Sequence, residues 1–315
     1  MSTKPGDLLM AAPERWDEAC FMLPALRALV ASGLKTGVLC HPAQLPLWQS
    51  VPGAEVIGIP DQTRDAVAVI RGHWQAALLW EAGRAADLAA KAAMPRRLGP
   101  AAEPKLRRRL THPLAATPGP LDHRVRFYLA AIEEMGIATD RPEFFAPLGN
   151  PPDRAAVLLA PESDYGPSHE WAPGRWLELA RALIEDGRSL RIAAIRKNGT
   201  AEKLAAALGA EILDATHPGA VLAELAQYRF LISADASLPH LAAHAGATCI
   251  TLFGPNDPQW KRPLGKRHLV LRRHVECAPC LLRKCPLDLR CQRELEAATV
   301  VEAVRSMLAA ITADA

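Results

Sequence analysis

Residues 229–265 read RFLISADASLPHLAAHAGATCITLFGPNDPQWKRPLG. The apolar run at 229–233 predicts a buried strand, which ends in a tight turn at 234–237. A helix follows over 239–245, and the second apolar run at 248–253 predicts another buried strand. Two buried strands separated by a helix are typical of a parallel sheet that is covered on both faces.

The same alternation runs through the whole sequence. We expect further strands at 7–12, 36–40, 55–59, 76–80, 156–160, 189–195 and 268–272, with helices at 18–32, 84–93, 123–135, 175–186, 201–208, 220–227 and 299–311. The segment 139–153 holds four prolines and predicts a linker. The sequence therefore predicts an α/β protein with two Rossmann-like domains, residues 1–148 and 149–315, that face an interdomain cleft.

Composition and missing motifs exclude several classes of protein function. The chain has 37 Lys and Arg against 34 Asp and Glu, and this net charge of +3 is too small for a dedicated nucleic-acid binder. Acidic residues near the start leave no room for a signal peptide, and the seven cysteines suit a reducing compartment, so we expect a soluble cytoplasmic protein. Motifs of dinucleotide oxidoreductases, P-loop kinases, zincins and serine hydrolases are absent.

The predicted turn after residue 233 is a candidate phosphate site. A helix that begins near Leu238 offers free backbone N–H groups and a partial positive charge. The Ser237 hydroxyl and the His240 ring could add further hydrogen bonds. The structural alternative is a helix that is simply capped by Asp235 or Ser237, with His240 on a solvated face.

The run DASLPHLAAHAG followed by TLFGPNDP is similar to the signature of glycosyltransferase family 9, the heptosyltransferases of the lipopolysaccharide inner core. That signature usually reads D-[ST]-G-x-x-H-[LV]-A-A-A-x-G, then a strand and G-P-[TS]-[DS]-P. The stretches 165–180, 82–99 and 17–29 resemble other segments of the family.

The resemblance implies a GT-B fold and an inverting transfer of heptose, or a related sugar, from a nucleotide sugar such as ADP-heptose to a lipopolysaccharide inner-core acceptor. No cofactor would be required for catalysis. The family's catalytic carboxylate falls on Glu18, or on Asp17 if the register slips by one residue. The alternative is that these acids only complement the dipole of a helix N-terminus. The donor diphosphate would lie against Asp235, Ala236, Ser237, Leu238 and His240.

Several residues depart from the family pattern. His169 stands where the family has a phosphate-binding lysine, and Ser237 stands where it has a glycine. Arg196 or Lys197 could compensate for the missing lysine. Glu202 matches a residue that contacts the nucleotide ribose, although it also suits a solvated helix face. These departures keep open a degenerate member that binds sugar nucleotide, or a partner, without transfer; a GT-B nucleotide-sugar epimerase is a further alternative.

Basic residues in the first half suggest an acceptor site. Arg96 and Arg97 could form a cationic rim for an acidic glycolipid, because guanidinium groups bind phosphate well, or they could belong to a solvated surface. Any membrane contact would be peripheral, at the inner face of the inner membrane.

Four cysteines lie close together near the C-terminus: Cys277, Cys280, Cys285 and Cys291. Their spacing allows a structural zinc or iron site, reduced thiols or disulfides. The resemblance favours a structural role, because a related branch of the family uses such cysteines to hold iron. Cys20, Cys40 and Cys249 lie in apolar segments and are expected in the core.

Overall fold

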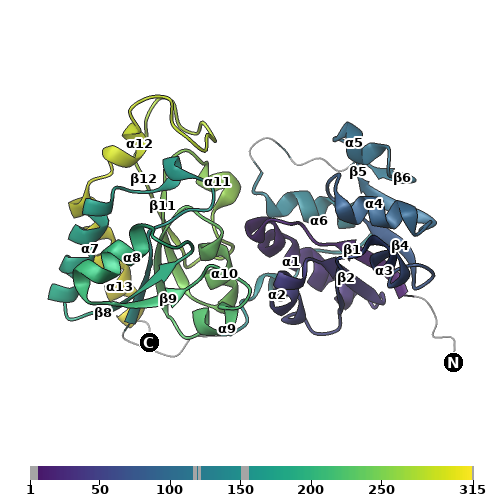
Figure 1. The fold of residues 1–315 in the computed structure, drawn as a ribbon, viewed down its shortest axis with the longest axis horizontal. Helices are drawn as coiled ribbons and strands as arrows, with labels where there is room; N and C mark the ends of the chain where they lie inside the picture. The colour runs from purple at the N-terminus through teal and green to yellow at the C-terminus, as the bar shows by residue number, and fades with distance from the viewer. Residues whose placement is uncertain (1–5, 116–118, 120–121, 150–155, 314–315) are drawn as a thin grey trace. The chain divides into compact units, whose positions relative to one another are not determined.

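A computed structural model describes residues 6–115, 119, 122–149 and 156–313. The chain divides into two compact units, Met1–Phe145 and Ala146–Ala315 (Figure 1). Each unit contains a six-stranded parallel sheet, which confirms the predicted α/β class.

The sheet of the first unit has the strand order β3-β2-β1-β4-β5-β6. Its strands are β1 (Gly6–Ala11), β2 (Thr36–Cys40), β3 (Glu55–Gly58), β4 (Trp74–Leu78), β5 (Arg96–Pro100) and β6 (His112–Leu114). The α-helices of this unit are α1 (Trp16–Ala31), α2 (Leu45–Gln49), α3 (Thr63–Ala68), α4 (Arg84–Lys91), α5 (Pro104–Arg107) and α6 (Val125–Glu134), and the 3-10 helices are η1 (Pro42–Gln44) and η2 (Pro142–Phe145).

The sheet of the second unit has the order β12-β11-β10-β7-β8-β9. Its strands are β7 (Ala156–Ala160), β8 (Ser189–Ala194), β9 (Glu211–Asp214), β10 (Phe230–Ala234), β11 (Thr248–Phe253) and β12 (Leu269–Arg272). The helices are η3 (Pro167–His169), α7 (Pro173–Glu185), α8 (Thr200–Leu208), α9 (Leu222–Leu225), α10 (Leu238–Ala245), α11 (Pro258–Lys261), α12 (Arg290–Arg293) and α13 (Ala297–Ala313).

Both sheets share the topology of the Rossmann fold. When the strands of the second unit are numbered from its own first strand, its order is also 3-2-1-4-5-6, read from the other side. The strand order reverses between β1 and β4 in one unit and between β7 and β10 in the other. Ligands of such sheets bind beyond the carboxyl ends of the strands at this reversal. Each unit is therefore expected to carry its functional groups there.

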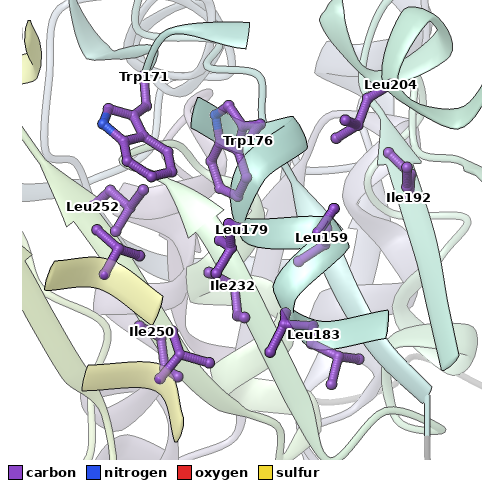
Figure 2. Close-up of a cluster of buried hydrophobic side chains, with 14 of the residues drawn as sticks. Leu159, Trp171, Trp176, Leu179, Leu183, Ile192, Leu204, Ile232, Ile250 and Leu252 are labelled. Carbon is purple, nitrogen blue, oxygen red and sulfur yellow. The ribbon is translucent and has the colours of Figure 1, made fainter. Parts of the chain in front are cut away.

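The core of the second unit lies between its sheet and the helices α7, α8 and α13 (Figure 2). Leu159, Ile232 and Ile250 project from three strands of the sheet into this core. The indole rings of Trp171 and Trp176 meet edge to face, with their centres 5.5 Å apart. Aromatic pairs favour this geometry, and the two large rings contribute much of the buried apolar area.

One tryptophan shapes the sheet of the first unit. The Trp74 ring lies against Gly6 and Gly37 on two neighbouring strands. A methyl group on either glycine would lie 2.3 Å from an atom of this ring. Because carbon atoms do not approach so closely, both positions require glycine while Trp74 is in place.

The sequence pattern did not predict several short strands and helices correctly. β5, β6 and β9 were not predicted, because β5 begins with two arginines, β6 contains a proline and β9 is exposed at three of its four residues. The helix predicted at 220–227 is shorter in the structure, where α9 covers Leu222–Leu225. Part of the predicted linker forms η2, and residues 150–153 of that linker lie outside the described residues. Among the residues that the structure describes, no helix has the length and apolar character needed to cross a membrane.

We expect Leu159→Ala to lower the free energy of unfolding by about 2–5 kcal/mol, because it removes buried methyl groups from the core of the second unit and leaves a cavity. Chemical denaturation monitored by circular dichroism would measure the change. Leu287→Ala is the control, since this side chain is 66% exposed and its loss should cost less than about 0.5 kcal/mol. Equal losses for the two variants would contradict the assigned core.

Candidate functional site

A buried carboxylate joins three loops at the carboxyl ends of β7, β10 and β11. Asp235 follows β10 directly and is fully buried. Its Oδ2 atom accepts hydrogen bonds from His169 Nδ1 at 2.9 Å and from Asn256 Nδ2 at 2.7 Å. His169 lies in the loop after β7, and Asn256 lies in the turn after β11. The prediction that Asp235 and His169 belong to one site is thus consistent with their contact.

The two carboxylate oxygens of Asp235 have different surroundings. Burial raises the pKa of this carboxyl group, while the hydrogen bonds from His169 and Asn256 and the charge of Lys261 lower it. Its second oxygen, Oδ1, is buried and has no hydrogen-bond partner among the described residues. A buried acceptor without a partner is costly, so a donor group from a ligand would be favourable there.

A buried lysine lies next to this cluster. Lys261, the last residue of α11, is only 6% exposed. Its ammonium nitrogen lies 5.3 Å from the centre of the Tyr165 ring, which in turn meets the His169 ring edge-on at 5.5 Å. Sequence reasoning missed Lys261, although its place three residues after the end of the GPNDP turn was a usable signal.

The start of α10 differs from the expected phosphate cradle. The Ser237 N–H donates to Asp164 Oδ1 at 2.8 Å, and Pro239 has no N–H to offer. Neither Asp235 nor Ser237 caps the helix through its side chain, and His240 is buried, so the structural alternative of a capped helix with a solvated histidine is wrong. A carboxylate on the Ser237 amide nevertheless shows that this position accepts negative charge.

Hydrogen bonds and an ion pair connect the loops around Asp235. The Ser163 hydroxyl donates to the Asp235 carbonyl oxygen at 2.6 Å, and the Ser163 N–H donates to Glu170. Glu170 also forms two hydrogen bonds with the Arg196 guanidinium, at 2.7 and 2.8 Å. The Arg196 guanidinium is therefore already paired with the Glu170 carboxylate. Glu202 accepts the Asn198 N–H at 2.9 Å, which is a local contact at the start of its own helix.

The first unit places Glu18 at the start of α1, just beyond the carboxyl end of β1. Its carboxylate accepts hydrogen bonds from Arg124 Nε at 2.9 and 3.0 Å and from the Tyr128 hydroxyl at 2.7 Å. The neighbouring Asp17 accepts from the Arg15 guanidinium at 2.9 and 3.1 Å. The Glu18 side chain is 11% exposed, whereas that of Asp17 is fully covered. Of the two, Glu18 is the carboxylate that another molecule could reach.

A second carboxylate lies on the other side of the β1–β4 reversal. Glu81 follows β4, and its Oε1 atom lies 3.5 Å from the Glu14 amide nitrogen. Burial raises the pKa of Glu81, and the nearby charges of Glu14, Glu18 and Glu103 raise it further, against the lowering effect of the Glu14 N–H. Glu81 was not predicted, because nothing in its sequence neighbourhood marks it as more than a surface acid.

The two predicted acceptor arginines lie elsewhere. Arg96 and Arg97 open β5, so they lie at the amino end of that strand, while Glu18 and Glu81 lie beyond the carboxyl ends of β1 and β4. The Arg97 guanidinium donates to the carbonyl oxygens of two nearby residues, at 2.6 and 2.7 Å. The structure does not bring these arginines together with the carboxylates.

A protein-family model described as glycosyltransferase family 9 (heptosyltransferase) matches residues 126–290, which is more than half of the chain. The chain belongs to glycosyltransferase family 9. The resemblance noted in the sequence is thereby confirmed.

Relatives of this family 9 chain are known in both sequence and structure. It is 32% identical over 118 residues to lipopolysaccharide heptosyltransferase 1 of Pseudomonas aeruginosa, covering 36% of this chain and 33% of that protein. The aligned region spans between a third and a half of the curated relatives it first matches. The solved structure of the E. coli ADP-heptose LPS heptosyltransferase II has a TM-score of 0.78 at 18% identity, covering 98% of this chain and 100% of that chain. The GT-B fold is confirmed.

The four cysteines of the predicted metal site lie in the segment that leads into α12 and in α12 itself. A more distant structural neighbour is the iron-containing heptosyltransferase TibC, with a TM-score of 0.61 and 13% identity. Here Cys277 is exposed and Cys291 is buried, and Cys280 and Cys285 are half-buried free thiols. Within residues that the structure describes, no three His, Cys, Asp or Glu side chains come together to hold a metal ion. The structural zinc or iron site and the disulfide alternative remain predictions, because burial raises the pKa of Cys291 and the other three loop cysteines lie close enough for their charges to raise it further.

We expect the thiols to fall into two reactivity classes. Burial raises the pKa of Cys40 to about 12 and that of Cys291 to about 11, and it also raises the pKa of Cys20 and Cys249. A raised pKa leaves less of the reactive thiolate, so these four should react with Ellman's reagent only after unfolding. The three remaining thiols, Cys277, Cys280 and Cys285, should react in the native protein. Protection of all four loop thiols that a chelator relieves would instead show a bound metal.

Proposed function

We propose that this chain is an inverting glycosyltransferase that moves heptose, or a related sugar, from a nucleotide sugar such as ADP-heptose to a lipopolysaccharide inner-core acceptor. The observation that carries the proposal is the buried cluster of Asp235, His169, Asn256 and Lys261 at the strand-order reversal of the second unit. Membership of family 9 and the names of the relatives support the same activity.

The second unit would bind the donor. Lys261 would supply a cationic group for the diphosphate beside the His169–Asp235 pair, and Ser237 and His240 would line the start of α10 next to it. The backbone of Ala236 and Leu238 completes this turn. The open Oδ1 atom of Asp235 is suited to accept a hydroxyl group of the sugar. Glu202 would contact the nucleotide ribose, and its Oε2 atom also accepts the Asn198 N–H.

The first unit would supply the base. The Glu18 carboxylate takes the proton from an acceptor hydroxyl, the acceptor oxygen bonds to the anomeric carbon from the face opposite the diphosphate, and the bond from that carbon to the phosphate oxygen breaks. The nucleoside diphosphate leaves with the electron pair of that bond, and the configuration of the sugar is inverted. Cationic groups around the leaving diphosphate stabilise its developing charge, so no metal is needed for this step.

Glu81 is the second candidate for the base. The Glu18 carboxylate already accepts hydrogen bonds from Arg124 and Tyr128. Glu81 has the raised pKa that suits a general base, and it follows the neighbouring strand. The two assignments predict different variants to be inactive.

We expect Glu18→Gln to lower the turnover number about 10²- to 10⁴-fold, the usual contribution of a general base. Donor affinity should stay unchanged, because the base acts on the acceptor. Transfer of labelled sugar to a truncated acceptor would measure the first quantity and calorimetry the second. Glu55→Gln, an exposed acid on an edge strand, is the matched control. Loss of activity in Glu81→Gln alone would move the role to Glu81, and full activity in both variants would refute a carboxylate base at this site.

We expect Lys261→Met to weaken binding of ADP about 10- to 100-fold, because a hydrogen bond to a charged group contributes about 1.5–3 kcal/mol. Binding of adenosine should not change, since it carries no diphosphate. Isothermal titration calorimetry measures both, with the exposed Lys266→Met as control. Unchanged ADP affinity in Lys261→Met would remove this residue from the donor site.

The competing functions differ in their products. A degenerate member would bind nucleotide sugar without transferring it, and an epimerase would convert the sugar without any acceptor. Assays with several nucleotide sugars, in the presence and absence of acceptor and with a chelator added, separate these cases. We further propose that the protein works in the cytoplasm, in peripheral contact with the inner face of the inner membrane, where it would meet an acidic glycolipid acceptor.

A further inference from the structure

We propose that residues 281–287, here named the leucine loop, dock on the surface of an anionic lipid bilayer. The loop reads LLRKCPL and belongs to the segment that connects β12 to α12, at the α12 end of the second unit (Figure 1). Leu281, Leu282 and Leu287 are 50%, 44% and 66% exposed. Three large apolar side chains exposed within seven residues form a patch that water solvates poorly.

The backbone of the leucine loop is fixed to the body of the unit. The Leu281 N–H donates to the Pro255 carbonyl oxygen at 2.9 Å. The carbonyl oxygens of Leu282 and Arg283 accept hydrogen bonds from the Ser168 hydroxyl and the Ser168 N–H, respectively. The leucine side chains are therefore presented outward from an anchored backbone, and little conformational entropy would be lost when they become buried.

The positive charges of the leucine loop are not paired with nearby acids in the part of the chain that the structure describes. Arg283 and Lys284 are exposed, and neither forms an ion pair with a carboxylate among the described residues. The acids on either side of the loop, Glu276 and Asp288, both pair with Arg290. The loop thus combines free positive charge with apolar side chains, which is the combination that binds anionic headgroups and the acyl boundary beneath them.

A bilayer fits this patch better than a protein partner does. Stable protein interfaces bury about 800 Å² on each side, and their cores are enriched in aromatic residues and depleted in lysine. The leucine loop is only seven residues long, has no aromatic residue and contains Lys284 at its centre. Leucines that insert shallowly between headgroups need no shaped partner. The inference rests on the proposed function, which puts the protein at the inner membrane, and it names the surface that would contact the bilayer; vesicle binding and sugar transfer are measured separately, so either can fail alone.

Co-sedimentation of the full chain with vesicles tests the inference without any substrate. We expect binding to vesicles of phosphatidylcholine and phosphatidylglycerol, at least tenfold weaker binding to pure phosphatidylcholine, and release by high salt. The triple variant Leu281→Ser, Leu282→Ser, Leu287→Ser should lower the affinity at least tenfold. The charge variant Arg283→Glu, Lys284→Glu should do the same without altering the apolar side chains.

A matched control replaces apolar side chains elsewhere on the same unit. Ile184→Ser and Ile212→Ser change residues that are 44% and 40% exposed, and they should leave vesicle binding unchanged. Thermal unfolding of each variant checks that the fold is kept. The proposal is overturned if the wild-type chain fails to bind anionic vesicles, or if either loop variant, while folded, binds as the wild type does. Equal binding to neutral and anionic vesicles would also overturn it, since the free cations would then have no role.

Discussion

The hydrogen bonds to the buried Asp235 carboxylate are the constraint on which the rest of the site depends. A carboxylate without water is unstable unless donors surround it, and here the donors come from two other loops, through His169 and Asn256. One side chain thus ties together the chain segments that follow β7, β10 and β11. Because the strands beneath are fixed by their ladders, the positions of the surrounding polar groups follow from this one interaction.

The charges of the carboxylates are offset differently in the two units. In the second unit, the buried Lys261 and the hydrogen-bond donors His169 and Asn256 lie around Asp235, so the cluster can accommodate the added negative charge of a ligand. In the first unit, several carboxylates lie near one another, and Arg124 with Tyr128 offsets the charge of Glu18. One sheet edge therefore suits an anionic ligand, whereas the other suits a group that gives up a proton.

Much of the fold could be predicted from the sequence. The strands predicted at 156–160, 229–233 and 248–253 overlap β7, β10 and β11, because central parallel strands are buried on both faces and are therefore mostly apolar. Edge strands such as β6 and β9 lack that constraint and were missed. Within the candidate site, Asp235 and His169 were predicted from the family motif. Lys261 and Glu81 were not predicted, because each gains its surroundings only from strands that neighbour it in space.

The sequence by itself determined the α/β class, the alternation of strands and helices, and the family, since periodicity and local motifs are properties of consecutive residues. Only the tertiary structure decided which side chains meet. It bound Arg196 to Glu170 and set Arg97 against backbone carbonyls. These outcomes depend on distances between segments far apart in the chain, and such distances follow from packing rather than from the spacing of residues along the chain.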